Sequence, residues 1–122
     1  MNGIVDLFDV QQSGSTVVIT LLRNPTELGS TELLDCDPGG AIRLLESQQA
    51  KNVIINCQNI DRCCSSAVGL FVKLWKRTQA NGGRFVVCNL CGHLRQVVEI
   101  LRLDGMWPVI DSLAEAIEHV EK

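Results

Sequence analysis

The segment Val53–Phe71, VIINCQNIDRCCSSAVGLF, contains the pattern that decides the fold. Its apolar run, Val53–Ile55, predicts a buried strand, a short polar loop follows, and Ser65 and Ser66 stand at the predicted start of a helix. Backbone N–H groups in the first turn of a helix have no partner within the helix, and the helix dipole favours negative charge there. A serine at this point can simply cap the helix, which is the commoner role, or can carry a phosphate where an anion is tolerated.

The size and composition of the chain are those of one globular domain. It has 122 residues, of which 46% are apolar and 20% charged, and this length can bury a core without metal or disulfide staples. We therefore expect a single domain over residues 1–122. The net charge of −3 and the scattered distribution of the 11 basic residues argue against nucleic-acid binding, which needs clustered Lys and Arg.

The sequence lacks the features of an export signal or a membrane span. The first residues, MNGIVDLFDV, lack the basic head and long apolar run of a signal peptide, and no apolar stretch reaches the length of a membrane span. We expect a cytoplasmic protein without a membrane span. Its six cysteines are then expected to be reduced thiols rather than disulfides.

The first half of the chain predicts a hairpin followed by a helix. Ile4–Val10 and Thr16–Leu22 have the composition of strands, and Ser13-Gly14 between them is a turn signal, which favours antiparallel pairing. Asp37-Pro38 predicts a helix start, because proline suits the first helical position, and this helix is expected to end near Gln49.

The second half of the chain alternates strands and helices. Strands are predicted over 52–57, 84–89 and 107–110, and Pro108 restricts the last of these to a sheet edge or a strand start. The helix after the serines ends at Asn81-Gly82-Gly83, a second closes at Asp104-Gly105, and the last begins at Asp111-Ser112. The apolar faces of these two later helices consist of Leu94, Val97, Val98 and Leu101, and of Leu113, Ala116, Ile117 and Val120. Strands separated by helices pair in parallel, so we expect an α/β fold with a mixed central sheet of about five strands and about four helices.

The motifs of common enzymes are missing from the sequence. Ser65 and Ser66 have no histidine nearby and do not lie in a Gly-x-Ser-x-Gly elbow. The sequence also lacks the glycine-rich loops that cradle nucleotide phosphates. We expect a protein that is not an enzyme and that uses no cofactor.

The segment Cys88–Cys91 forms a Cys-x-x-Cys motif where a strand meets a helix, and it leaves a second interpretation open. This placement resembles that of thiol redox motifs, and His93 with Cys63-Cys64 would supply further metal ligands, although at no standard zinc spacing. The other interpretation is structural, since Cys88 continues a buried strand, where a free cysteine behaves as a small hydrophobe.

The order and spacing of the motifs from Val53 to Asp111 resemble the STAS domain of bacterial anti-anti-sigma factors. That family has an apolar strand, Asp-Ser-Ser-Gly-Leu-Gly before a helix, Gly-Gly, a Val-rich strand ending in Asn, and a Phe-Pro-like final strand. The matching elements here are Ile60-Asp61, Cys64-Ser65-Ser66-Ala67-Val68-Gly69, Gly82-Gly83-Arg84, Val86–Leu90 and Trp107–Ser112. The first half of the chain agrees with the family only in its strand-strand-helix order.

The resemblance implies a small regulatory protein whose partner is a kinase-type anti-sigma factor. Ser65 matches the serine that the partner kinase phosphorylates, with Ser66 as second choice, and phosphorylation releases the partner. The implied partner-binding residues are Asp61, Arg62, Cys64, Ser65, Ser66, Val68 and Gly69.

Three residues depart from the family pattern near this serine. Cys64 replaces the Asp of the motif, Ala67 replaces its first Gly, and Asn56 replaces the acidic residue usual at the end of the preceding strand. An alternative is therefore a STAS interaction subunit that is not phosphorylated and that serves a transporter or a signalling assembly.

Overall fold

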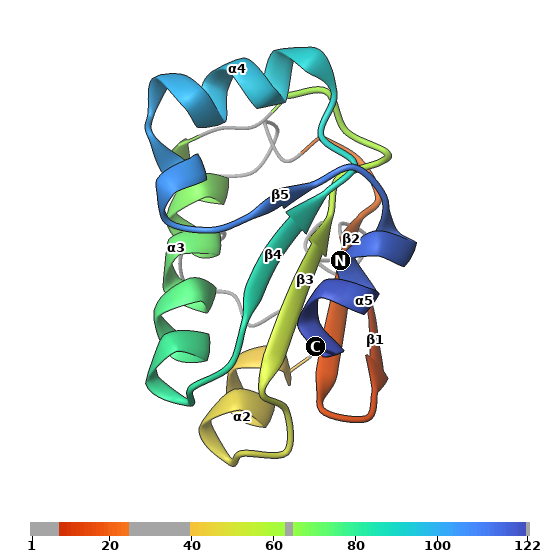
Figure 1. Cartoon of the computed structure of the whole chain (residues 1–122), viewed down its shortest axis with the longest axis vertical. Coiled ribbons are helices and arrows are strands. Elements are labelled where there is room, and N and C mark those ends of the chain that lie inside the picture. The colour runs from red at the N-terminus through yellow and green to blue at the C-terminus, as the bar shows by residue number, and fades with distance from the viewer. Residues whose placement is uncertain (1–7, 25–39, 63–64, 122) are drawn as a thin grey trace, which may run out of the picture.

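The computed structural model describes residues 8–24, 40–62 and 65–121, and its centre is a five-stranded mixed sheet. The strand order is β1-β2-β3-β4-β5, as Figure 1 shows. The strands are β1 (Phe8–Ser13), β2 (Thr16–Leu21), β3 (Asn52–Asn56), β4 (Phe85–Cys88) and β5 (Val109–Ile110). β1 pairs with β2 antiparallel, and each later pair is parallel, which confirms the predicted α/β fold with a mixed sheet.

Helices cover both faces of the sheet. They are α2 (Ala41–Glu46), α3 (Ser65–Ala80), α4 (Gly92–Ile100) and α5 (Leu113–Glu121), with a short 3-10 helix, η4 (Leu103–Gly105), after α4. On β3, Val53 and Ile55 belong to the larger core, with buried side chains of α2 and α3, whereas Ile54 packs with Ala116 and Val120 of α5. The apolar run that predicted a buried strand is therefore explained by burial on two faces. Figure 1 shows α5 in front of the sheet.

The hairpin is confirmed, but its first strand is shifted relative to the prediction. β1 runs on through Gln11 and Gln12 to Ser13 instead of ending at Val10, and the part of the prediction before Phe8 lies outside the described residues. β1 is an edge strand with one exposed face, so its polar side chains can continue the pairing with β2.

The first helix ends earlier than predicted. α2 stops at Glu46 and not near Gln49, because Gln48 has a φ of 64°, a left-handed conformation that a helix cannot continue through. The predicted start at Asp37-Pro38 lies outside the described residues, and the helix there begins after Gly40, which also has a positive φ of 76°.

The glycine pair after α3 ends the helix as predicted. Gly82 has a φ of +69°, and its N–H donates to the carbonyl of Gln79 at 3.1 Å. The N–H of Gly83 donates to the carbonyl of Thr78 at 2.8 Å, so two of the last helical carbonyls are satisfied in a Schellman motif. This turn sets where the chain enters β4.

The prediction for the end of α4 was wrong. The helix stops at Ile100, Arg102 takes a left-handed φ of 57°, and the residues at Asp104-Gly105 belong to η4. Leu101, predicted on the apolar face, is 53% exposed because it follows the last helical turn. The turn at Arg102 brings Leu103 into the core instead.

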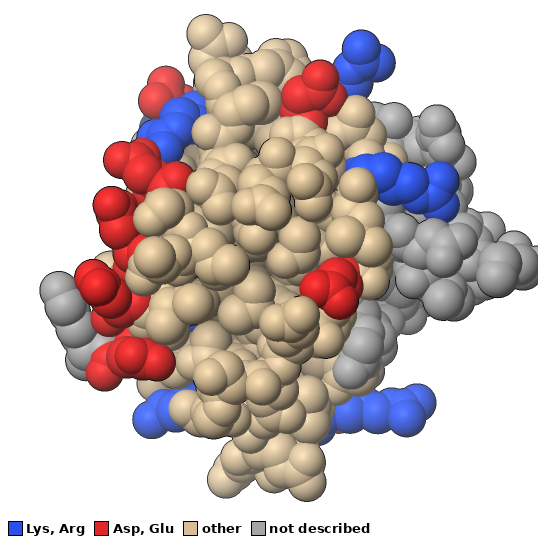
Figure 2. All heavy atoms as spheres, turned by 90° about the vertical axis from the view of Figure 1, so that its right-hand side faces the viewer, with Lys and Arg blue, Asp and Glu red and all other residues tan. Residues whose placement is uncertain are grey.

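The last strand and helix agree with the prediction in place but not in strand length. β5 contains only Val109 and Ile110, and Trp107 lies before the strand, where its ring packs at a tilt of 55° against that of Phe85 with centroids 5.1 Å apart. The N–H of Glu115 donates to the Ser112 hydroxyl at 3.2 Å, which confirms the predicted helix start. Carboxylates gather over α5 on the face seen in Figure 2, and those of Glu115, Glu118 and Glu121 are exposed as predicted.

Candidate functional site

Polar side chains gather where the parallel strands end. Asn24 follows β2, Asn56 ends β3, and Asn89 follows β4. In sheets of this kind, ligands and partners are usually met outside the carboxyl ends of the strands, where loops are free to vary. The loop that leads from β3 to Ser65 starts at these carboxyl ends, so the predicted site and this polar cluster share one end of the molecule.

Asn24 holds the loop after β3 at Asp61 and Arg62. Its side-chain N–H donates to a carboxylate oxygen of Asp61 at 2.8 Å. Its carbonyl oxygen accepts from the backbone N–H of Asp61 at 3.0 Å and from that of Arg62 at 3.2 Å. The thiol of Cys91 also lies 3.9 Å from the backbone oxygen of Asp61. The loop is thereby attached to the segments that follow β2 and β4.

Asn56 connects the carboxyl ends of β2, β3 and β4. Its side-chain oxygen accepts from the side-chain N–H of Asn89 at 2.9 Å and from the backbone N–H of Gln58 at 3.3 Å. Its own N–H group donates to the hydroxyl of Thr20 at 3.4 Å. Asn56 is only 2% exposed, so these bonds replace the water that its amide loses on burial. A neutral amide at this position both donates and accepts, which an ionised carboxylate cannot do.

The residues predicted to bind the partner are distributed over the loop and the first turns of α3. Asp61 and Arg62 are exposed on the loop. Ser65 and Ser66 are the first residues of α3, whereas Cys64 lies outside the described residues. Val68 is half-buried and packs against the larger core, and Gly69 lines a shallow surface pocket with Lys73 and Lys76. The helix start at the serines is confirmed, and the role of each residue in binding stays a prediction.

Asn24 and Asn89 were missed by the sequence interpretation. Asn24 precedes Pro25 and has the pattern of an ordinary turn, and its partner Asp61 is 37 residues away. Asn89 has a left-handed φ of 60°, a conformation that asparagine adopts more readily than most residues. The sequence interpretation made Asn89 the last residue of the predicted strand 84–89, whereas β4 ends at Cys88 and Asn89 begins the turn that follows.

The two cysteines of the Cys-x-x-Cys motif have different environments. Cys88 is fully buried in β4, and burial raises the pKa of its thiol from an ordinary value of 9.0 to about 11. This favours the thiol over the nucleophilic thiolate. Cys91 is half-buried just before α4. Among residues 8–24, 40–62 and 65–121, no group of three or more His, Cys, Asp or Glu is arranged to hold a metal ion. The buried-strand interpretation of Cys88 accounts for its surroundings.

The raised pKa of Cys88 predicts a loss of stability in alkali. Below about pH 9 the thiol is protonated in both states, but between pH 9 and 11 it ionises only in the unfolded chain, which favours unfolding. The free energy of unfolding of the native sequence should fall by about 2–3 kcal/mol more over this range than that of Cys88→Ala. Urea titrations at several pH values would measure both slopes. Equal slopes would show that Cys88 is not the group responsible.

Known structures share this arrangement of sheet and helices. A STAS domain protein from Planctomyces limnophilus is 22% identical with a TM-score of 0.75, over 94% of this chain and 98% of that one. The anti-sigma factor antagonist SpoIIAA of Bacillus, in its unphosphorylated form, is 22% identical with a TM-score of 0.70, over 93% and 97% of the two chains. An anti-sigma factor antagonist from Mycobacterium paratuberculosis is 16% identical with a TM-score of 0.74, over 94% and 93%. SpoIIAA is also known in a phosphorylated form.

The family of the chain follows from its sequence. The family model of the STAS domain matches residues 3–116, so the chain belongs to the STAS domain family. No curated protein sequence matches it significantly. None of the helices in the described ranges has both the length and the apolar character that crossing a membrane requires.

Proposed function

We propose that this STAS domain is an anti-sigma factor antagonist that binds a kinase-type anti-sigma factor and is switched by phosphorylation of Ser65. The observation that carries the proposal is the position of Ser65 as the first residue of α3, a few residues after Asp61, which Asn24 and Cys91 contact. α3 is 16 residues long, and Leu70 and Leu74 on it are fully buried, so the acceptor begins a rigid element. At α3 a partner would meet a helix that is already formed.

Phosphorylation would change the charge of this surface without unfolding the domain. A phosphate carries nearly two negative charges at neutral pH, and the unpaired N–H groups of the first helical turn can donate hydrogen bonds to its oxygens. The added charge would then act on the partner and not on the fold, by opposing a surface that is complementary to the unmodified serine. The phosphorylated form of SpoIIAA supports this interpretation for a protein of the same fold.

Two neutral residues of the site lower the negative charge that would surround a phosphate on Ser65. Asn56 and Cys64 replace two residues that are acidic in the family pattern, and Asp61 is the carboxylate held in the loop. A surface with fewer carboxylates gains relatively more negative charge from one phosphate. We infer that one phosphate would make up a larger share of the negative charge at this end of the sheet than it would with Asp at both positions.

The role requires neither catalysis nor a cofactor from this chain. The kinase activity would belong to the partner, and the STAS domain would supply the acceptor hydroxyl and the binding surface. Because the proposed partner acts on a sigma factor inside the cell, the role also places this chain in the cytoplasm.

The test uses the purified chain with the kinase-type anti-sigma factor from the same genome. With ATP, the intact mass should rise by one phosphate, and fragmentation should locate it on Ser65. Ser65→Ala should prevent the phosphate and keep partner binding, whereas Ser66→Ala, the matched control, should keep both.

A separate substitution tests whether negative charge at position 65 weakens partner binding. Ser65→Glu should weaken partner binding about tenfold or more, since it places a carboxylate in a desolvated interface. If the partner binds but neither serine is ever modified, and Ser65→Glu binds as the native chain does, the phosphorylation switch is wrong. The non-phosphorylated STAS subunit would then be the better interpretation. Failure to bind any kinase-type anti-sigma factor would contradict the proposed partner itself.

A further inference from the structure

A shallow groove lies on the outer side of α3. Its volume is about 370 Å³, and three small or aliphatic residues and three cations line it, namely Gly69, Val72, Ala80, Lys73, Lys76 and Arg77. The side of α3 that carries Leu70 and Leu74 is buried in the larger core. Side chains as small as those of Gly69 and Ala80 let another helix approach closely, so this surface suits the docking of a second helix.

The residues of α3 make the groove basic. The helix carries three cations and has no aspartate or glutamate between Ser65 and Ala80. Arg77 forms an ion pair with Glu46 of α2 at 3.3 Å, in which both side chains are about half exposed. Lys76 is exposed and has no ion-pair partner within residues 8–24, 40–62 and 65–121. The groove therefore suits an occupant that carries carboxylates.

Exposed carboxylates form a complementary surface on α5. This helix carries Glu115, Glu118 and Glu121, all of them exposed, and no lysine or arginine. Figure 2 shows carboxylates gathered along one side of the molecule. None of the three glutamates has an ion-pair partner in the part of the chain that the structure describes. We call these three residues the acidic face of α5.

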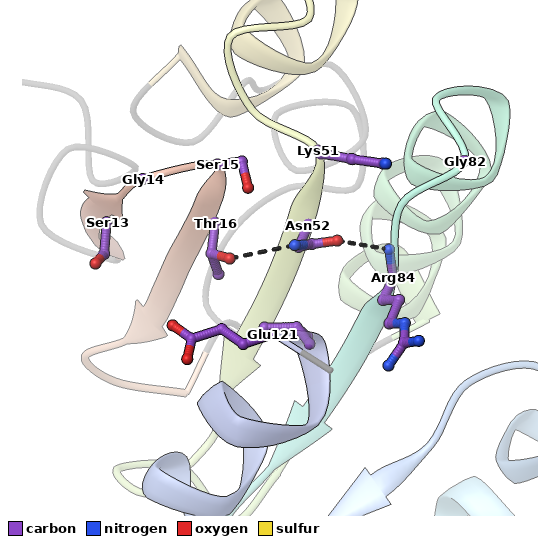
Figure 3. Close-up of a pocket in the computed structure, with 10 residues that line it drawn as sticks. Ser13, Gly14, Ser15, Thr16, Lys51, Asn52, Gly82, Arg84 and Glu121 are labelled. Carbon is purple, nitrogen blue, oxygen red and sulfur yellow. Dashed lines mark hydrogen bonds between the residues drawn. The ribbon is translucent and has the colours of Figure 1, made fainter.

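Arg84 reaches α5 through a backbone carbonyl and not through a carboxylate. Its guanidinium donates to the carbonyl of His119 at 2.6 Å. Figure 3 shows Asn52 beside it, which donates to the hydroxyl of Thr16 at 3.3 Å and accepts from the backbone N–H of Arg84 at 2.9 Å. In the same view the guanidinium of Arg84 and the carboxylate of Glu121 end on opposite sides of Asn52. The acidic face therefore stays available to a second molecule.

The groove and the acidic face cannot meet within one molecule. α3 packs with Val53 and Ile55 on one face of the sheet, and α5 packs with Ile54 on the other (Figure 1). Their charges have matching spacings. Lys73 and Lys76 are three residues apart, as are neighbouring carboxylates of α5, and three residues rise about 4.5 Å along a helix. The acidic face of one copy therefore fits the groove of another.

We propose that the groove on α3 binds the acidic face of α5 of a second copy of this chain. Each copy offers the groove on one side of its sheet and the acidic face on the other, so the contact is head-to-tail and continues into an open chain of molecules. Ion pairs at a surface are individually weak and are screened by salt, so the association is weak and depends on ionic strength. It uses the middle and end of α3 and is independent of the Ser65 switch.

The test measures the average mass of the native chain by light scattering over a range of protein concentrations. In about 20 mM salt the mass should rise continuously with concentration, beyond that of a dimer. In about 0.5 M salt it should stay that of one chain, because the Debye length falls from about 20 Å to about 4 Å. A mass that stays that of one chain in low salt, or that stops at a dimer, would overturn the head-to-tail contact.

Glu118→Lys tests the acidic face. It should weaken the association about fivefold or more, because it replaces an attraction by a repulsion at the middle carboxylate. Glu99→Lys is the matched control, since Glu99 is an exposed glutamate on α4 and its replacement changes the net charge equally. Both substitutions reduce the net negative charge, so an effect of net charge alone would favour association in both. Equal behaviour of the two variants would contradict the proposal.

A double charge reversal tests whether the two surfaces contact each other. Lys76→Glu alone should weaken the association as Glu118→Lys does, because Lys76 is the exposed cation of the groove. Lys76→Glu combined with Glu118→Lys should restore it, since the reversed charges attract again and the net charge returns to −3. If the double variant associates as weakly as the single variants, the groove and the acidic face are not partners and the proposal is wrong.

Discussion

Gly83→Ala is expected to lower the free energy of unfolding by at least about 3 kcal/mol. A Cβ atom on Gly83 would lie 1.7 Å from the carbonyl oxygen of Lys51 and 2.6 Å from its carbonyl carbon. Both are backbone atoms, so no side-chain rotation can relieve the clash. Either the α3–β4 turn or the start of β3 has to move, and both are fixed, by the Gly83–Thr78 bond and by the Lys51–Ser15 bond.

The matched control for this substitution is Gly92→Ala. Gly92 is the first residue of α4, and a Cβ there would meet nothing within 4 Å. Because alanine favours a helix over glycine, the control should be neutral or stabilising by up to about 1 kcal/mol. Urea unfolding followed by circular dichroism measures both variants. Equal midpoints for the two variants would show that the close approach at Gly83 does not constrain the fold.

Asn56→Ala is expected to cost about 3 kcal/mol of stability at the candidate site. The substitution removes the acceptor of the Asn89 side chain and of the Gln58 N–H, and the donor to Thr20. Asn56 is 2% exposed, so partners left without it cannot easily be satisfied by water. The loss should be accompanied by faster amide exchange in the loop after β3, because that loop begins at the lost bond.

A double-mutant cycle would isolate the pair at the centre of this cluster. Asn56→Ala and Asn89→Ala together should cost less than the sum of the single variants, because each alone already breaks their 2.9 Å bond. Gln58→Ala is the control, since its side chain is exposed and only its backbone N–H bonds to Asn56. Additive single losses, or a Gln58→Ala loss as large as that of Asn56→Ala, would contradict the role given to Asn56.

The order of the elements could be predicted because its signals lie within a few residues of each other. Val53–Ile55 predicted a strand, the serines a helix start, and Gly82-Gly83 a helix end, and each is confirmed. Ends without such a signal were missed. α4 was extended to Asp104-Gly105 because nothing in the sequence announces the left-handed Arg102.

The candidate site could be predicted only in part. The start of α3 at Ser65 was found, since a serine before an apolar helical pattern is a local signal. The contacts of Asn24 with Asp61 and of Asn56 with Asn89 were not predicted, because they join residues that are 37 and 33 positions apart in the sequence. Such pairs form only after the strand order and register have placed separate segments at one sheet edge.

The sequence by itself determined the strands, the helices and the position of the serine at a helix start, since periodicity, caps and glycine stops act over one or two turns of chain. Only the tertiary structure decided which polar side chains meet. The parallel pairing of β2, β3 and β4 brings Asn24, Asn56 and Asn89 together at the carboxyl ends of the strands. It brings Thr16, Asn52 and Arg84 together at the amino ends. The physical reason is that hydrogen bonds between distant residues depend on register, and register is fixed by packing both faces of the sheet at once.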